Sequence, residues 1–244
     1  MKESTFCPEN DHTVCKNVPA ATEKDVRTAE NGTKMQENDH TVRKKRSFPC
    51  EKTGKDDLPA TDKITLRRRL IAARNATPPN IRQERDEAIV RRVAALSCFK
   101  EATAVLLYVP NGSEIDVRPL ASEAWRRKIP VGLPVCDRAA KTLTFRRALP
   151  DVPLIEGAYG IPVPSENAET ITPDEKTVCV LPALAYDEKR VRLGYGGGYY
   201  DRFLVGFQGV AVGVAYTDTV LESVFAEPHD RRADILVTET DIFR

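Results

Sequence analysis

No apolar stretch in this 244-residue chain approaches the ~20 residues that a membrane-spanning helix needs. The first 20 residues also lack the apolar core of a secretory signal. These two absences predict a protein of the cytoplasm that has no membrane partner.

Neither sign of charge is in excess. The chain holds 37 Lys and Arg against 36 Asp and Glu, so its formal net charge is +1. Such a chain has no overall field that would draw it to nucleic acid or to a membrane. Separately from the charge, we expect a monomer with small-molecule partners. Nucleic-acid binding through the basic run Arg43–Arg46 and a basic first helix stays a weaker alternative.

Cysteine pairs at zinc-site spacing are also missing. The six cysteines are scattered, and three of them lie in apolar segments, which is typical of free thiols in a reducing compartment. Five residues of the N-terminal segment are conceivable metal ligands, although their spacing matches no established site: Cys7, His12, Cys15, His40 and Cys50.

Residues 1–60 contain two phenylalanines but no tyrosine or tryptophan, and few aliphatic residues. A segment of this composition buries too little apolar area to offset its ordering entropy, so we predict a polar, low-complexity, disordered extension. It carries an internal repeat, because residues 9–14 and 37–42 both read Glu-Asn-Asp-His-Thr-Val. The folded domain is predicted to span residues 61–244.

Within that domain, apolar runs alternate with segments of helical periodicity. Alternation of this kind predicts an α/β fold, a three-layer sandwich around a mostly parallel sheet. Thr61 or Asp62 is the expected cap of the first helix. The predicted helices cover Lys63 to about Asn75, about Asn80 to Ser97, about Asp116 to Lys128, and the segment after Gly198; the predicted strands are Thr103–Val109, Val131–Val135, Leu143–Phe145, Val178–Ala185, Gly209–Ala215 and, last, Asp234–Thr238, with a long loop from Leu149 to Pro173 and a β-turn at Ala158–Gly160.

The run from Arg192 to Arg202 holds four of the chain's thirteen glycines between two cations. Glycine lets backbone N–H groups approach an anion and adopt positive φ, and flanking cations neutralise its charge, so the composition favours a phosphate cradle that opens a helix. A flexible glycine loop or hairpin turn is the alternative. The run has no Gly-Lys-Ser/Thr ending and no dinucleotide fingerprint.

Other candidate residues lie outside this run. Lys63, Arg67 and Arg74 fall at about 0°, 40° and 20° around the first predicted helix, so they form one cationic stripe, either solvated or facing the glycine loop. Glu114 follows a buried strand, where its carboxylate suits the N–H donors of an aminopyrimidine ring. Its alternative is an acid at a helix N-terminus.

Asp201 and Asp230 are candidate Mg²⁺ ligands, because a nucleotide-bound metal usually takes one or two protein carboxylates. The alternative for Asp230 is a surface turn salt-bridged to arginine. His229 is a candidate general base or a solvated side chain. We find no Ser-His-Asp or Cys-His arrangement, which favours phosphoryl transfer from a bound nucleotide.

Together these residues resemble the 5-formyltetrahydrofolate cyclo-ligase family. The resemblance runs from about Lys63 to Thr240. Its strongest part is Leu181-Pro-Ala-Leu-Ala-Tyr-Asp187 leading into Arg192-Leu-Gly-Tyr-Gly-Gly-Gly-Tyr-Tyr-Asp201, and its supporting parts are Lys63-x-x-x-Arg67, Tyr108-Val-Pro, Glu114-Ile-Asp116, Pro228-His-Asp230 and Val237-Thr-Glu239.

The resemblance implies an enzyme that uses ATP and Mg²⁺ to close 5-formyltetrahydrofolate into 5,10-methenyltetrahydrofolate, releasing ADP and phosphate through a phosphorylated formyl group. Catalytic roles would fall on Arg192, Tyr199 and Asp201, and Mg²⁺ on Asp201 and Asp230. ATP would be bound by Lys63, Arg67, Arg192, Leu193, Gly194, Tyr195, Gly196, Gly197, Gly198, Tyr199 and Tyr200, and the folate by Val109, Glu114, Tyr195, Gly196, Gly197, Gly198 and Tyr199.

Two features depart from the family pattern. Ala183 and Tyr186 stand where the family usually has Gly and Phe, which restricts the backbone slightly and adds a hydroxyl that needs a partner. The polar extension is not usual in the family either. A non-catalytic protein that holds folate or nucleotide remains the second hypothesis.

Overall fold

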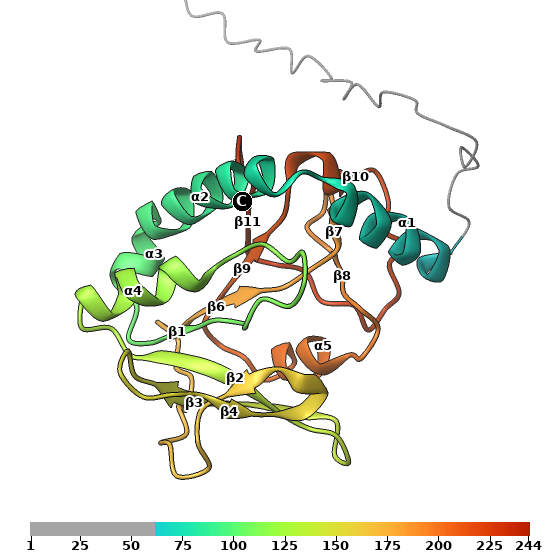
Figure 1. The fold of residues 1–244 in the computed structure, drawn as a ribbon. Helices are drawn as coiled ribbons and strands as arrows, with labels where there is room; N and C mark the ends of the chain where they lie inside the picture. Colours follow the sequence, from blue (N-terminus) through green and yellow to red (C-terminus); the bar gives the residue numbers. More distant parts are fainter. Residues whose placement is uncertain (1–61) are drawn as a thin grey trace, which may run out of the picture. The chain divides into compact units, whose positions relative to one another are not determined.

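A computed structural model describes residues 62–244, shown as a ribbon in Figure 1. The predicted disordered extension, its repeat, its conceivable metal ligands and its basic run lie outside the described residues.

A seven-stranded sheet of order β12-β11-β9-β6-β1-β2-β3 forms the centre of the fold. The five inner strands run parallel, and each edge strand pairs antiparallel with its neighbour. This confirms the predicted mostly parallel sheet. The strands are β1 Val105–Leu106, β2 Val131–Asp137, β3 Thr142–Ala148, β6 Val178–Leu181, β9 Val210–Val214, β11 Ile235–Val237 and β12 Ile242–Phe243.

Helices cover both faces of this sheet, because its inner strands are apolar on both sides. The helices are α1 Lys63–Ala76, α2 Pro79–Ala95, α3 Ser97–Lys100, α4 Arg118–Arg126 and α5 Tyr199–Leu204. Val105 packs with α2, α3 and α4 in one core cluster, and the next residue, Leu106, belongs to the cluster on the α5 side. On that second face the ring of Phe203 in α5 lies 5.0 Å from the ring of Phe145. The three-layer α/β prediction is therefore confirmed.

Helix α1 packs on a second, three-stranded sheet of order β10-β7-β8. Its strands are β7 Ala185–Asp187, β8 Arg192–Leu193 and β10 Val220–Leu221. Leu66 of α1 is buried against Ala185 and Leu193 in one cluster. The predicted cap is confirmed at Asp62, whose side chain accepts the Thr65 N–H at 2.8 Å. This packing sets α1 beside the segment that follows β8.

The predicted strand Val178–Ala185 is wrong as one element. Strand β6 ends at Leu181, and β7 begins at Ala185 in the other sheet. Pro182 has no N–H to continue the ladder, so the chain leaves the large sheet there. The turn between the two strands directs the following residues toward α1.

Other boundaries also differ from the sequence prediction. The second predicted helix breaks at Leu96, which has extended dihedrals of φ −59° and ψ 140°, so α2 and α3 are separate. The predicted last strand is followed by β12. The predicted long loop contains a two-stranded antiparallel pair, β4 Ile155–Glu156 and β5 Pro162–Val163, around a 3₁₀ turn at Ala158–Gly160. These short elements have too few residues for a periodicity to show in the sequence.

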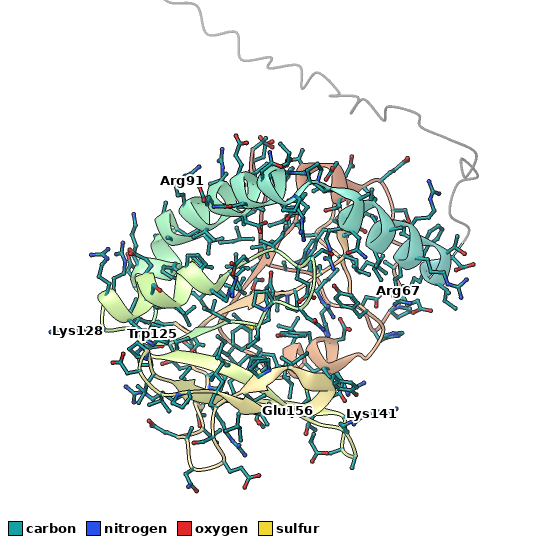
Figure 2. The ribbon with its side chains drawn as sticks, in the orientation of Figure 1. Arg67, Arg91, Trp125, Lys128, Lys141 and Glu156 are labelled. Carbon is teal, nitrogen blue, oxygen red and sulfur yellow. The ribbon has the colours of Figure 1, made fainter. Side chains whose placement is uncertain are left out.

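The chain's single tryptophan, Trp125, lies in α4. Its indole N–H donates to the carbonyl of Ala148 in β3 at 3.2 Å, so it fastens α4 to the edge of the sheet. Figure 2 shows it beside Lys128, on the opposite side of the molecule from Arg67. Among the described helices, none combines the length and the apolar character that crossing a membrane would require.

Candidate functional site

The glycine run forms the link between β8 and α5. Gly196 has φ +99° and Gly198 has φ +66°, a region that favours glycine, and Gly198 is the N-cap of α5. The helix predicted after the run is therefore present. It has only six residues, so its dipole is weak and side-chain cations must supply most of the positive charge at this loop.

The cationic stripe of α1 faces this loop, as one of the two sequence interpretations expected. Arg67 donates from Nε to the carbonyl of Gly194 at 2.8 Å. Arg74 is buried and donates to the hydroxyl of Tyr195 and to Ser113 Oγ. The loop is thus held against α1 by two arginines from successive parts of one helix face.

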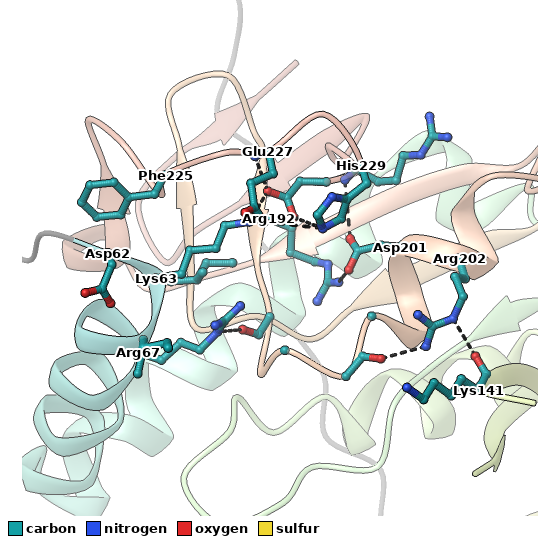
Figure 3. A pocket seen from close by; sticks show the side chains of 18 of the residues that line it. Asp62, Lys63, Arg67, Lys141, Arg192, Asp201, Arg202, Phe225, Glu227 and His229 are labelled. Atoms are coloured by element: carbon teal, nitrogen blue, oxygen red, sulfur yellow. Dashed lines mark hydrogen bonds and ion pairs between the residues drawn. The ribbon is translucent and has the colours of Figure 1, made fainter. Parts of the chain in front are cut away.

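A charged cavity of about 980 Å³ opens between α1, the glycine loop and the segment around Asp230. Figure 3 shows its side chains and ion pairs. Lys63 lies 2.6 Å from Asp230 and 2.7 Å from Glu227, and Arg192 lies 2.8 Å from Asp201. Two of the cations that line this cavity, Lys63 and Arg192, are therefore paired with its acids, whereas Arg67 binds a backbone carbonyl.

These pairs shift the titration of their members. Burial lowers the pKa of Lys63, but its hydrogen bonds to Asp230 and Glu227 outweigh burial, so the pKa of Lys63 lies above its ordinary value. Burial raises the pKa of Asp230, but the hydrogen bond from Lys63 and the Glu227 N–H outweigh it and leave that pKa below its ordinary value. Both groups are held in their charged forms at neutral pH.

Asp201 and Asp230, the two predicted metal ligands, both line this charged cavity. The sequence alternative for Asp230, a salt bridge to arginine, is not what the structure shows, because its partner is Lys63. Glu227, His229 and Asp230 present ligand atoms within 4.8 Å of one another. Asp201 is not a member of this group, but Glu227 and Asp230 supply carboxylate oxygens, which are the donors that Mg²⁺ prefers.

A second cavity, of about 570 Å³, lies on the other side of the glycine loop. Val109, Glu114, Tyr195 and Tyr199 all line it. The carboxylate of Glu114 accepts the Asn111 N–H at 2.9 Å. Helix α4 begins only at Arg118, so Glu114 stands before the helix and not within its first turn.

This second cavity, the aromatic cavity, is lined by a tyrosine that the sequence did not predict, Tyr159. Tyr159, from the 3₁₀ turn between β4 and β5, places its hydroxyl 2.9 Å from that of Tyr199. The guanidinium of Arg138 lies 4.6 Å from the Tyr159 ring centre. Tyr159 has φ +61°, which is uncommon for a residue with a side chain. The only sequence signal was an aromatic residue among Pro and Gly.

Tyr195 follows Gly194, whose carbonyl accepts from Arg67, and its own hydroxyl accepts from Arg74. Burial and the nearby Glu114 carboxylate raise the pKa of Tyr195 to about 12, against the opposing effect of Arg74. Its hydroxyl is therefore protonated at neutral pH. Tyr200 lines the same cavity, and its buried hydroxyl has no partner among the described residues.

Five positions of the loop line both cavities: Arg192, Gly194, Gly196, Gly197 and Gly198. Of these two cavities, the charged one alone is bordered by Lys63, Arg67, Asp201 and Asp230, and the aromatic one alone by Val109 and Glu114. Leu193 is buried against Leu66 in a core cluster, and it also lines the charged cavity. The loop is a shared wall between two neighbouring cavities.

The fold and the shared loop define an α/β protein with two ligand-sized cavities joined at a glycine-rich wall. The sequence profile of the 5-formyltetrahydrofolate cyclo-ligase family matches residues 59–239. The chain belongs to the 5-formyltetrahydrofolate cyclo-ligase family.

Individual relatives agree with this assignment. The chain is 33% identical over 177 residues to a 5-formyltetrahydrofolate cyclo-ligase of Mycolicibacterium smegmatis, covering 69% of this chain and 89% of the relative. It is 32% identical over 150 residues to the enzyme of the same name from Haemophilus influenzae, covering 59% and 80%. The solved structure of Aquifex aeolicus 5,10-methenyltetrahydrofolate synthetase superposes with a TM-score of 0.66 at 33% identity, covering 75% of this chain and 92% of that one.

Proposed function

We propose that this protein catalyses the ATP- and Mg²⁺-dependent cyclisation of 5-formyltetrahydrofolate to 5,10-methenyltetrahydrofolate, with release of ADP and phosphate. Its family membership supports the substrate, since relatives carry the names 5-formyltetrahydrofolate cyclo-ligase and 5,10-methenyltetrahydrofolate synthetase. The observation that carries the proposal is the glycine loop, which lines a charged cavity on one side and an aromatic cavity on the other.

ATP would occupy the charged cavity. Its phosphates would meet the loop amides together with Lys63, Arg67 and Arg192, which line the cavity from two directions. A triphosphate needs several cations, and these need not be neighbours in sequence. Because Lys63 and Arg192 already pair with acids, their side chains are held in place before the nucleotide arrives.

The folate would occupy the aromatic cavity. The carboxylate of Glu114 would accept hydrogen bonds from the amino and ring N–H groups of the pterin, while Val109 lines the pocket beside it. Tyr199 would stack on a folate ring, and the hydroxyl contact between Tyr159 and Tyr199 would keep both rings at the mouth. This arrangement brings the N5-formyl group to the shared wall.

At that wall the formyl oxygen attacks the γ-phosphorus of ATP, and the bond from that phosphorus to the bridging oxygen of ADP breaks. The product is an imino-phosphate, in which the formyl carbon is doubly bonded to N5. The N10 amine then attacks this carbon and loses its proton, and phosphate leaves with the carbon–oxygen bonding electrons. Arg192 would stabilise the charge that develops on the transferred group, and Asp201 fixes the direction of the Arg192 guanidinium.

Asp201 and Asp230 would hold the Mg²⁺ that accompanies ATP. Such an ion neutralises phosphate charge during transfer. Both carboxylates are partly buried at the cavity wall, where their oxygens can serve as ligands to the ion.

The test is a turnover assay with the full chain, 5-formyltetrahydrofolate and MgATP. We expect the near-UV absorbance of the methenyl product to rise with one ADP released per folate. Asp201→Asn should lower turnover strongly, while Asp151→Asn, an exposed aspartate that lines neither cavity, should not. Tight folate binding in calorimetry without absorbance change or ADP would instead support the non-catalytic binding protein.

A further inference from the structure

Two apolar side chains that line the charged cavity stand exposed near its ion pairs. Ile64 is 60% exposed and Phe225 is 37% exposed, and both line this cavity. They immediately flank an ion pair, because Ile64 follows Lys63 and Phe225 precedes Glu227 by two residues. Apolar surface is unfavourable in water, so binding of a ligand that covers these two side chains is stabilised by their burial.

The backbone at Phe225 turns its ring away from the core. The residue has φ +56°, a left-handed conformation that a bulky side chain rarely adopts. Its N–H donates to Ser223 Oγ at 3.2 Å, which helps to hold the turn. The preceding residue, Val224, is fully buried, whereas the Phe225 ring belongs to none of the core clusters among residues 62–244. Strain that serves no packing often marks a functional position.

The order of groups along the cavity matches the order of groups in a nucleotide. Arg192 and the glycines lie at the wall shared with the aromatic cavity, where the transferred phosphoryl group must be. Lys63 with its acids comes next. Figure 3 shows Phe225 beyond Lys63, at the end of the cavity opposite Arg202 and Lys141. A nucleotide whose last phosphate faces the shared wall would therefore extend its base toward Phe225.

We propose that the Phe225 ring is the platform on which the base of the nucleotide stacks. The inference rests on the proposed function, because it assumes that the phosphates occupy the charged cavity. It adds a specificity-determining residue: Phe225 distinguishes a nucleotide from a bare polyphosphate, which has the charges but no ring. Stacking on one aromatic face requires no particular pattern of polar groups on the base.

The test separates the base from the phosphates. The Mg²⁺ complexes of ADP and of inorganic tripolyphosphate are titrated by calorimetry into the full-length protein. Phe225→Ala should weaken ADP about five- to tenfold, the lower part of the range for base–aromatic stacking, and leave tripolyphosphate within about twofold. Phe225→Trp should restore ADP binding. Ile155→Ala removes a comparably exposed apolar side chain that lines neither cavity, and should change neither affinity.

Each other result counts against the platform in its own way. Equal weakening of both ligands by Phe225→Ala would mean that the ring only supports the turn before Glu227, and unchanged binding of both would mean that the base lies elsewhere. In either case wild-type turnover of formyltetrahydrofolate would leave the proposed function standing. Wild-type protein that binds no ADP would overturn the platform and the proposed function together.

Discussion

Arg74 joins three segments of the site, and its removal should be costly. Arg74 is 8% exposed, and its guanidinium donates to Ser113 Oγ at 3.1 Å, to the carbonyl of Ala183 at 3.3 Å and to the hydroxyl of Tyr195. These partners belong to the loop before Glu114, to the turn between β6 and β7, and to the glycine run. Arg74→Ala leaves all three acceptors without this donor.

The size of the effect follows from the number of bonds. At a net ~1 kcal/mol for each of three hydrogen bonds, Arg74→Ala should lower the free energy of unfolding by about 3 kcal/mol. For a domain of this size that corresponds to a fall in Tm of about 6–12 °C. Arg74→Lys keeps the charge but reaches fewer acceptors, so we expect roughly half the loss. Because Ser113 and Tyr195 both line the aromatic cavity, the KM for folate should rise in both variants.

Thermal unfolding followed by circular dichroism measures the first effect, and the turnover assay measures the second. Arg68→Ala, an exposed arginine of the same helix, is the matched control and should change stability by no more than about 0.5 kcal/mol. If Arg74→Ala unfolds within about 2 °C of the wild type, the assignment of Arg74 as the link between these segments is wrong.

Three further variants probe the charged cavity. Arg67→Ala should raise the KM for ATP about tenfold, the loss of roughly one charge-assisted contact, and an unchanged KM would remove it from the phosphate site. Gly196→Ala should lower turnover, because φ +99° costs a side chain about 1–3 kcal/mol, whereas Gly206→Ala, which has open space and no positive φ, should be tolerated in the same assay. Because the pKa of Asp230 is lowered in the folded state, its ionised carboxylate stabilises the fold at pH values above 3.8, its ordinary pKa. This stability is lost as the pH falls through the lowered pKa. Denaturant titrations from pH 6 to pH 2 should show a steeper acid loss in wild type than in Lys63→Met, and parallel curves would exclude the ion pair as the cause.

The parts of the site that the sequence predicted are those with a local pattern. The glycines between two cations indicated the loop, and the spacing of Lys63, Arg67 and Arg74 indicated one helix face. Whether that face met the loop depended on how α1 packs through Leu66, which helical spacing does not determine. The apolar runs likewise predicted a mostly parallel sheet, because burial on both faces leaves a continuous hydrophobic signature.

The parts that the sequence did not predict depend on contacts between distant segments. Tyr159 reaches Tyr199 across 40 residues, and its strand pair has only two residues on each side. The pairing of Lys63 with Asp230 spans 167 residues. No local pattern carries such information. The run Val178–Ala185 misled for a related reason, since two strands of different sheets are both apolar and only Pro182 marks the boundary between them.

Trp125 gives this molecule a useful optical property. It is the only indole in the chain, it lines neither cavity, and its N–H is fixed to the edge of the sheet. Its fluorescence should therefore report the docking of α4 on β3 and stay almost constant when either cavity fills. Fluorescence changes during a ligand titration would then signal a rearrangement of the sheet edge, while a separate probe placed near Tyr159 would be needed to follow occupancy.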